Sequence, residues 1–251
     1  MTLLAHAGAP PAELVRMLAP TGVLRAGINL SNFLLVSGRN SDGEPAGVSP
    51  DMARALAERL GVGLEYVTYE SPGKLADAAE RDEWDVALLG AEPQRAEVIS
   101  FTPAYSEIEA TYLLPAGSPV GTIAEVDQPG RRIAVTARTA YGLWLDRNIQ
   151  HAELVSTKTF DEAIEVFLNQ NLDALAGLRP RLVNDAKEIA GSRLLPGRYT
   201  AVQQALGTPK RSDAAIGYLA RFVQSAIVSG HVAGLIAKHG VEGLTVAPPA
   251  T

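Results

Sequence analysis

The chain lacks several features on which common protein chemistries depend. None of its 251 residues is cysteine, so it forms no disulfide and carries no thiol nucleophile. Its few histidines (His6, His151, His231 and His239) show no metal-ligand spacing. Glycine-rich nucleotide loops, an HExxH pair and a GxSxG elbow are also missing. These absences predict a protein without a metal or a cofactor, which binds through polar groups that converge in a cleft.

Charge and hydropathy exclude further classes. The 28 acidic residues outnumber the 22 basic ones, and the net charge of −6 argues against a nucleic-acid partner or an anionic membrane surface. No apolar run approaches the roughly 20 residues of a membrane span, so no membrane insertion is expected. With 47% apolar and 20% charged residues, the composition is that of a soluble globular protein with one large domain or two lobes.

The stretch from Trp84 to Pro115 is the most informative. Val86–Leu89 is apolar on both faces and is therefore predicted to form a buried strand. Arg95 follows shortly after this strand, at the end where open α/β sheets bind ligands. Its planar guanidinium suits a carboxylate held by two hydrogen bonds. The alternative is a surface arginine that pairs with Glu92 or Glu97.

The second half of the chain repeats the order of elements predicted for the first half. Glu65 and Glu153 are 88 positions apart (153 − 65), and Asp85 and Asp173 have the same separation (173 − 85). Two α/β lobes of like topology explain this better than one continuous sheet. Lobe one is expected at 1–115 with 207–251, and lobe two at 116–206. Two extended crossings, near Leu113–Gly117 and Gln203–Gly207, are expected to act as the hinge.

Local signals predict several helix ends. Ser49 is expected to be the N-cap of a helix, with Pro50 in its first turn. Thr159 and Glu162 have the spacing of a capping box, and Leu168 is expected on the inward face of the helix that follows. A later helix is expected to be capped by Ser212 and Asp213.

The N-terminus carries no recognisable export signal. Residues 1–9 have no basic segment, their apolar run is short, and Pro11 already begins the first predicted helix. A cytoplasmic location is therefore expected. The alternative is a periplasmic protein from which a signal peptide was removed.

The run WDVALLG, followed by PxRA and then by IxFTxxY, resembles solute-binding protein family 3, the binding proteins of amino-acid-type ABC importers. The resemblance extends from about Leu24 to Gly240. It implies a type II periplasmic-binding-protein-like α/β fold, in which each of two lobes is a mixed sheet flanked by helices and two hinge strands join the lobes. It also implies a small-molecule carboxylate ligand and, if the chain is exported, an ABC permease as partner.

The resemblance assigns roles to particular residues. Arg95 corresponds to the arginine that grips the ligand carboxylate, and Thr139 falls on the hydroxyl position that completes this grip. The loop that contains Asn32 and Phe33 corresponds to one that lines the cleft. Simple alternatives remain: Thr139 is only a helix N-cap, Asn32 a turn residue, and Phe33 a core residue.

Other candidates come from their positions after predicted strands or near helix starts. The turn that contains Arg138 joins a strand to a helix, so its backbone N–H groups form an anion site. Lys74 lies on the first turn of a helix, where the alternative is a solvated side chain. The full set of candidate ligand-binding residues is Asn29, Asn32, Phe33, Lys74, Gly90, Glu92, Arg95, Arg138, Thr139, Arg179 and Gln203.

Two departures from the family pattern bear on the ligand. Glu92 stands where members usually have threonine or serine. The position that normally supplies an aspartate for the ligand's amine is Leu178, and Arg179 follows it. If Arg179 faces the cleft, arginine, lysine and histidine should bind poorly, and an ordinary α-amino acid is in doubt.

These observations predict a solute-binding protein that closes around a small carboxylate-bearing metabolite, amino-acid-like or an organic acid. One alternative is a cytoplasmic enzyme on the same scaffold, such as a cyclohexadienyl-dehydratase-like lyase with Glu92 as its catalytic acid. Another is a cytoplasmic ligand sensor. Recovery of unchanged ligand after incubation separates the binding roles from the enzyme.

Overall fold

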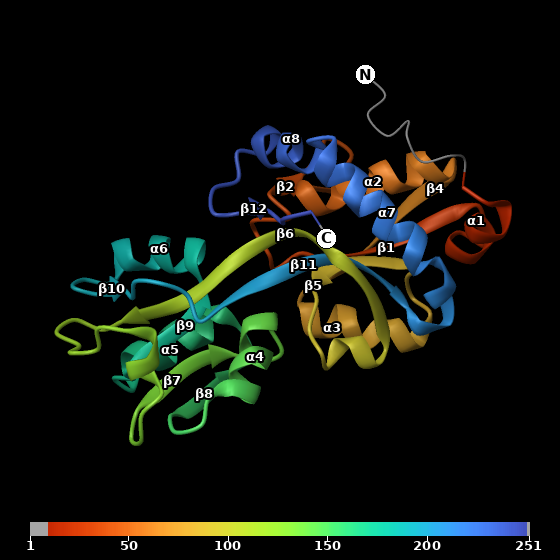
Figure 1. Ribbon diagram of the computed structural model, residues 1–251. Helices are drawn as coiled ribbons and strands as arrows, with labels where there is room; N and C mark the ends of the chain where they lie inside the picture. The colour runs from red at the N-terminus through yellow and green to blue at the C-terminus, as the bar shows by residue number, and fades with distance from the viewer. Residues whose placement is uncertain (1–9, 250–251) are drawn as a thin grey trace. The chain divides into compact units, whose positions relative to one another are not determined.

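A computed structural model describes residues 10–249 of the chain, shown in Figure 1. Residues 1–9, on which the expectation about an export signal rests, lie outside this range. The chain divides into two compact units: unit 1 ends at Glu107 and resumes at Gln203, and unit 2 is Ile108–Val202. Both divisions fall inside long strands, β6 (Ile99–Leu114) and β11 (Thr200–Pro209), and come earlier in the sequence than the limits expected at 115 and 206.

Unit 1 is built on a sheet in which β1 lies between β4 and β5, with β11 beyond β5. The strands β4, β1 and β5 are parallel to one another, and β11 is antiparallel to β5. Every residue of β5 is buried, as the apolar run predicted, because α2 and α3 cover opposite faces of the sheet (Figure 1). The elements of unit 1 outside β6 and β11 are α1 (Ala12–Leu18), β1 (Val23–Asn29), β2 (Gly38–Arg39), β3 (Pro45–Ala46), α2 (Val48–Leu60), β4 (Gly63–Tyr69), α3 (Pro72–Asp77), η1 (Ala78–Arg81), β5 (Val86–Gly90), η2 (Arg95–Glu97), η4 (Lys210–Ala215), α7 (Ile216–Val228), α8 (His231–Lys238) and β12 (Thr245–Val246).

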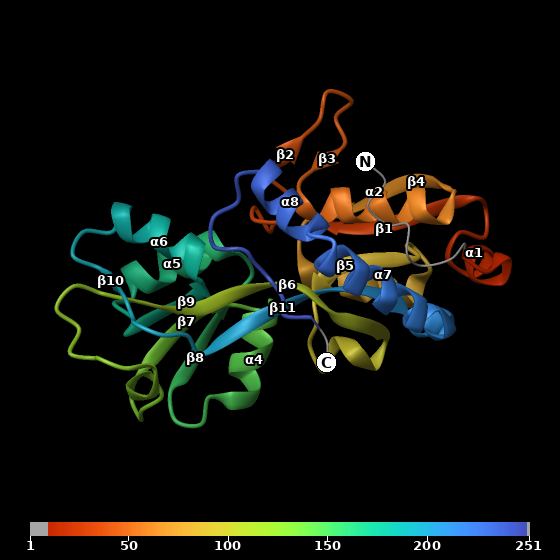
Figure 2. The ribbon, with the colours of Figure 1, turned by 45° about the horizontal axis from the view of Figure 1, so that its top comes forward.

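A short hairpin, β2–β3, projects from unit 1 (Figure 2). Its turn is held by Asn40, whose side-chain oxygen accepts hydrogen bonds from the backbone N–H groups of Asp42 and Glu44. This local use of an asparagine explains why the polar cluster at 40–45 forms a turn.

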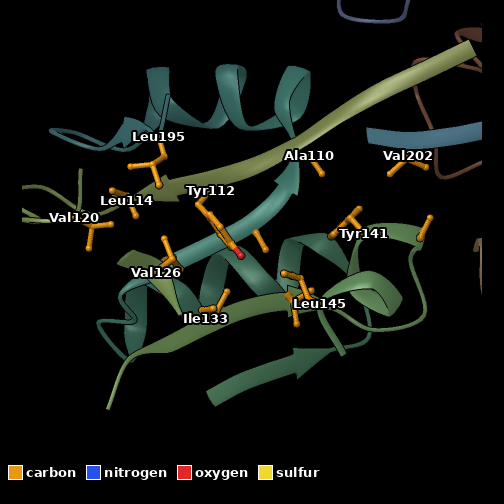
Figure 3. Packing of buried hydrophobic residues seen from close by; sticks show 14 residues of the cluster. Ala110, Tyr112, Leu114, Val120, Val126, Ile133, Tyr141, Leu145, Leu195 and Val202 are labelled. Atoms are coloured by element: carbon orange, nitrogen blue, oxygen red, sulfur yellow. The ribbon is translucent and has the colours of Figure 1, made fainter. Parts of the chain in front are cut away.

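Unit 2 has a sheet in which β7 lies between β8 and β9, all parallel, and β9 is antiparallel to the later part of β6. One face carries a cluster that includes Tyr112, Ile133 and Leu145 (Figure 3). The other face packs Phe167 and Leu182 against the sheet. The elements are η3 (Ile123–Val126), β7 (Arg132–Thr136), α4 (Ala140–Asn148), β8 (Glu153–Thr157), α5 (Phe160–Asn169), β9 (Ala174–Leu178), α6 (Arg179–Glu188) and β10 (Arg193–Leu194).

The 88-residue repeat corresponds to a pattern of hydrogen bonds that occurs once in each unit. In unit 1 the carboxylate of Asp85 accepts a hydrogen bond of 2.9 Å from the backbone N–H of Arg25, and the Asp85 N–H donates to the Arg25 carbonyl at 2.9 Å. In unit 2 Asp173 makes the same pair of contacts with Arg132, at 2.8 and 3.0 Å. Each aspartate therefore fastens the start of one strand to the start of its neighbour.

Two predicted helix starts were wrong. The helix α2 begins at Val48 after Gly47, whose φ of 148° and close approach to the Leu35 carbonyl leave no room for a Cβ atom. Ser49 is buried and its hydroxyl lies 2.9 Å from that of Tyr105 instead of capping the helix. Ser212 has non-helical backbone angles inside η4, so α7 begins only at Ile216.

The capping box was confirmed, whereas one residue of the helix behind it was misplaced. The Thr159 hydroxyl accepts from the Glu162 N–H, and the Glu162 side chain accepts from the Thr159 N–H. Leu168, expected to face inward, is instead 46% exposed on α5, next to the buried Phe167. Apolar periodicity alone therefore overestimated the width of the buried stripe.

Within residues 10–249, no single helix is both long and apolar enough to cross a membrane. One pair, Lys210–Val228 with His231–Lys238, meets the length and composition test together but is bent by 65°. In the same part of the chain, no group of three or more acidic, histidine or cysteine side chains is placed to hold a metal ion.

Candidate ligand-binding site

The candidate residues of unit 1 lie along one edge of its sheet. Because β1, β4 and β5 are parallel, their carboxyl ends meet at the same edge. The strand β11 runs the other way and pairs Gln204 with Gly90, so its early residues reach that edge as well. Asn29, Gly90 and Gln203 therefore share the edge at which open α/β sheets bind ligands.

Arg95 is the best-positioned candidate in unit 1. It begins η2, and its side chain is only 4% exposed, which rules out a solvated surface arginine. One of its terminal nitrogens donates a hydrogen bond of 2.6 Å to the Gly90 carbonyl. The backbone N–H of Ala96 donates to the Glu92 carbonyl at 2.9 Å and closes the turn. The guanidinium is thus held directly beyond the last residue of β5.

The loop after β1 uses its asparagines for structure. The Asn29 side-chain oxygen accepts from the N–H and the hydroxyl of Ser31, and that of Asn32 accepts from the N–H of Leu34. The turn role expected as the alternative for Asn32 is therefore present. Phe33 is 42% exposed, so the alternative of a core residue was wrong. Its ring is available to a ligand at this edge of unit 1.

Two further candidates of unit 1 have other contacts. Lys74 is exposed and forms an ion pair with Glu70, which lies just before the helix, as expected for a solvated lysine. The backbone carbonyl of Gln203 accepts a hydrogen bond of 2.8 Å from the Ala91 N–H. Gln203 therefore fastens β11 to the turn that carries Arg95.

In unit 2 the turn between β7 and α4 contains Arg138 and Thr139. Arg138 is exposed and adopts the left-handed conformation, with φ of 60°. The Thr139 hydroxyl accepts from the Gly142 N–H at 3.0 Å and donates to the Thr136 carbonyl at 2.8 Å. Thr139 is thus an N-cap, and its hydroxyl proton is already used. An anion at this turn would depend on backbone N–H groups.

Arg179 is paired with an acidic residue. It begins α6, and its Nε donates to the Glu109 carboxylate at 2.7 Å, while another nitrogen donates to the Gly197 carbonyl. The effect expected if Arg179 faces the cleft stays a prediction, and the structure adds that its guanidinium is paired with the Glu109 carboxylate.

Sequence reasoning missed both Glu109 and Arg198. Glu109 accepts from Arg179 and also lies 3.5 Å from a guanidinium nitrogen of Arg198. The strand β6 pairs Ala110 with Leu178, which brings Glu109 beside Arg179 despite a separation of 70 positions. The register of an antiparallel pair depends on long-range packing, so no local signal marked this contact.

The chain matches a family profile along most of its length. The profile of bacterial extracellular solute-binding proteins, family 3, matches residues 25–242. No curated protein matches the sequence.

Solved structures of similar fold include amino-acid-binding proteins. A substrate-binding protein of an amino acid ABC transporter from Streptococcus pneumoniae, bound to L-arginine, has a TM-score of 0.71 at 20% identity, with 93% of this chain and 99% of that chain covered. A putative binding component of an ABC transporter from Wolinella succinogenes, complexed with lysine, has a TM-score of 0.71 at 19% identity, covering 87% and 95%.

A third structure connects the fold with catalysis. It is an ancestral amino-acid-binding protein described as a precursor of cyclohexadienyl dehydratase, with a TM-score of 0.71 at 18% identity and 89% and 97% of the two chains covered. Together the three likenesses show the type II periplasmic-binding-protein fold that the sequence motifs predicted.

Proposed function

Because the chain belongs to family 3 of the bacterial extracellular solute-binding proteins, we propose that it binds a small carboxylate-bearing metabolite through Arg95. The observation that carries this proposal is the buried guanidinium beyond β5, oriented by the Gly90 carbonyl. Arginine binds a carboxylate through charge-assisted hydrogen bonds, and such bonds are stronger away from water than at a solvated surface.

The neighbouring groups fit this role. Phe33 offers an exposed ring on a loop at the same edge of unit 1, where it can cover the apolar part of a small ligand. Pockets for small molecules commonly combine such apolar surface with a few well-placed polar groups. Arg95 supplies the polar anchor, and Phe33 supplies the apolar contact.

Replacing Arg95 with alanine is expected to weaken ligand binding about 10- to 150-fold, since a hydrogen bond to a charged group contributes roughly 1.5–3 kcal/mol. The ligand that co-purifies with the protein is identified by mass spectrometry after denaturation and then titrated by calorimetry. Arg221→Ala, which removes an exposed arginine of α7, is the matched control and should bind normally. Unchanged affinity in a folded Arg95→Ala protein would remove Arg95 from the site.

We also propose that the two junctions between the units, at 107/108 in β6 and 202/203 in β11, act as a hinge on which the units close when a ligand binds. The first junction lies earlier in the chain than the crossing expected near Leu113–Gly117, which falls inside unit 2. Unit 2 is joined to the rest of the chain only at 107/108 and 202/203, and both junctions are extended strands. Closure about a few such residues is common in binding proteins.

Small-angle scattering should therefore show a smaller radius of gyration when ligand is added to the full-length protein. Arg95→Ala at the same ligand concentration should stay at the value of the free protein. Tight binding without any contraction would count against the hinge.

A second candidate function is a lyase on the same scaffold. Glu92 is half-buried in the turn that carries Arg95, where a carboxyl group can act as a general acid. The similarity in fold to a precursor of cyclohexadienyl dehydratase supports this candidate. Nuclear magnetic resonance of the ligand after incubation with the protein distinguishes the lyase from the binding protein. A new product that disappears in Glu92→Gln indicates the enzyme, whereas unchanged ligand indicates the binding protein.

Where the protein acts determines its partner. We propose a cytoplasmic location, in which the protein senses its ligand, whereas an exported protein would deliver ligand to an ABC permease. Cell fractionation followed by immunoblotting distinguishes the two locations.

A further inference from the structure

We propose that the segment 244–247, which contains the C-terminal strand β12, acts as a splint on the crossing strand β6 and confines its bending to two residues, Ile108 and Glu109. The segment 244–247 is called the splint below. This inference rests on the proposed hinge, because it locates the bend within β6.

The splint lies along the part of β6 that belongs to unit 1 (Figure 1). The strand β12 is antiparallel to β6 and pairs Thr245 with Glu107. Two residues further on, the Ala247 N–H donates a hydrogen bond of 3.1 Å to the Tyr105 carbonyl. The splint therefore holds β6 as far as Glu107, the residue at which unit 1 is interrupted.

On the other side of the junction, β6 is held by unit 2. The strand β9 pairs with β6 from Ala110 onward, starting opposite Leu178. The Ala110 carbonyl also accepts a hydrogen bond of 3.1 Å from the Tyr199 N–H. Each of the strands β12 and β9 lies wholly within one unit. Ile108 and Glu109 lie between the two ladders and belong to neither of them.

The strand β11 is also a neighbour of β6, but it does not oppose bending in the same way. It passes from one unit to the other itself, at 202/203, so it bends together with β6. A strand that belongs to a single unit resists bending, because a bend within the paired segment breaks backbone hydrogen bonds. The bend in β6 is thus limited to the residues that neither β12 nor β9 holds.

The splint is well anchored for a segment so close to the end of the chain. Leu244 and Ala247 are only 5% and 3% exposed. The Thr245 hydroxyl donates to the Glu107 carbonyl at 3.3 Å. Chain ends without such contacts fray. The family profile matches the chain as far as residue 242, so the splint lies beyond the matched region.

The helix α8, which precedes the splint, is fastened to α2. Lys238 Nζ and His239 Nε2 lie 2.7 and 2.8 Å from the same carboxylate oxygen of Asp51. Burial raises the pKa of Asp51, but the hydrogen bonds from Lys238 and His239 outweigh it and hold this pKa below its usual value. Asp51 therefore stays ionised at neutral pH and fixes the end of α8 from which the splint continues.

Two glutamates of β6 offer a matched test, because Glu107 lies in the part held by the splint and Glu109 lies in the gap. Glu109→Gly should raise the population of bent conformations about two- to fivefold over Glu109→Ala, which corresponds to the glycine–alanine difference of roughly 0.5–1 kcal/mol. Glu107→Gly should behave as Glu107→Ala does. The alanine variants account for the lost carboxylates, including the contacts of Glu109 with Arg179 and Arg198.

Electron–electron resonance between two spin labels measures these populations in the ligand-free, full-length protein. The chain has no cysteine, so the labels attach only at the introduced positions. Arg221→Cys in unit 1 and Glu165→Cys in unit 2 place them on exposed residues of α7 and α5. The distribution of distances between the labels should broaden in Glu109→Gly alone among the four variants.

Detaching the splint should extend the bend into unit 1. Ala247→Asp places a charge at a buried position and should make the backbone amides of residues 105–107 exchange with deuterium at least about tenfold faster. In this background Glu107→Gly should broaden the distribution as Glu109→Gly does. Pro249→Asp, which adds the same charge at an exposed position, should leave both measurements unchanged.

The outcomes separate this inference from the proposed function. Equal broadening by Glu107→Gly and Glu109→Gly in the protein with an intact splint, or no broadening by Glu109→Gly, would show that the bend is not confined to the gap. Unchanged exchange at 105–107 in Ala247→Asp would show that β12 is not a splint. None of these results concerns Arg95, and contraction of the wild type on ligand addition still tests the hinge itself.

Discussion

Replacement of Trp84 with alanine is expected to lower the free energy of unfolding by about 3–5 kcal/mol. The side chain is fully buried beside α3, in a cluster with Leu75 and Ile99. Its indole nitrogen donates a hydrogen bond of 3.0 Å to the Leu75 carbonyl. Gly27 on β1 makes room for the ring, because a Cβ there would lie 3.2 Å from it. Alanine would leave a cavity and a buried carbonyl without its donor.

Trp84→Phe is the matched control, since it fills most of the space and loses only the hydrogen bond. It should cost about 1–3 kcal/mol, the usual penalty for an unsatisfied buried group. Urea unfolding followed by circular dichroism measures both variants, and the fluorescence of Trp144, which lies in unit 2, reports on that unit separately. Equal losses for the two variants would mean that cavity formation contributes little.

Asp85→Ala is expected to destabilise the protein by about 2–4 kcal/mol, and the equivalent Asp173→Ala by about 1 kcal/mol. The two aspartates make the same backbone contacts in their units, but their surroundings differ. The Asp85 side chain is 5% exposed and binds the Arg25 guanidinium through both oxygens, at 2.7 and 3.1 Å. Its removal takes the buried partner from the Arg25 guanidinium, which keeps only the exposed carboxylate of Asp82, 2.8 Å away.

Asp173 is more exposed to solvent than Asp85. Its side chain is 36% exposed, and the nearest guanidinium nitrogen, from Arg131, is 3.6 Å away. Solvent screens such a pair, so mainly the hydrogen bond to the Arg132 N–H is lost. Asp85→Asn keeps an acceptor for the Arg25 N–H and should fall between the two alanine variants. Urea unfolding checks the order, which equal losses at positions 85 and 173 would contradict.

Several parts of the fold followed from local sequence. The capping box at Thr159 was readable because its hydrogen bonds join residues three positions apart. The buried strand Val86–Leu89 was readable because a short run that is apolar at every position, followed by a glycine and a proline turn, is typical of a strand covered on both faces. The 88-residue repeat was visible in the sequence as well. Only the structure showed that the repeated aspartates, Asp85 and Asp173, each bind the backbone of a neighbouring strand.

Other local signals were overruled by contacts with distant residues. Ser49 had the sequence context of an N-cap, but its hydroxyl is used by Tyr105, 56 positions away. Ser212 likewise preceded a helical pattern but lies in η4, where its backbone is not helical. A capping preference contributes only about 1 kcal/mol, so tertiary contacts of similar size can displace it.

The sequence by itself determined the family, the fold and the position of Arg95 after a buried strand, because these depend on motifs and on the periodicity of neighbouring residues. Only the tertiary structure decided how the charges of unit 2 are arranged. Arg179 was visible as a cation, but the pairing of β6 with β9 supplied Glu109, and the fold of the segment before β11 supplied Arg198. Strand register is set by the packing of the whole sheet, and this is why the contacts of Glu109 with Arg179 and Arg198 could not be read from the chain.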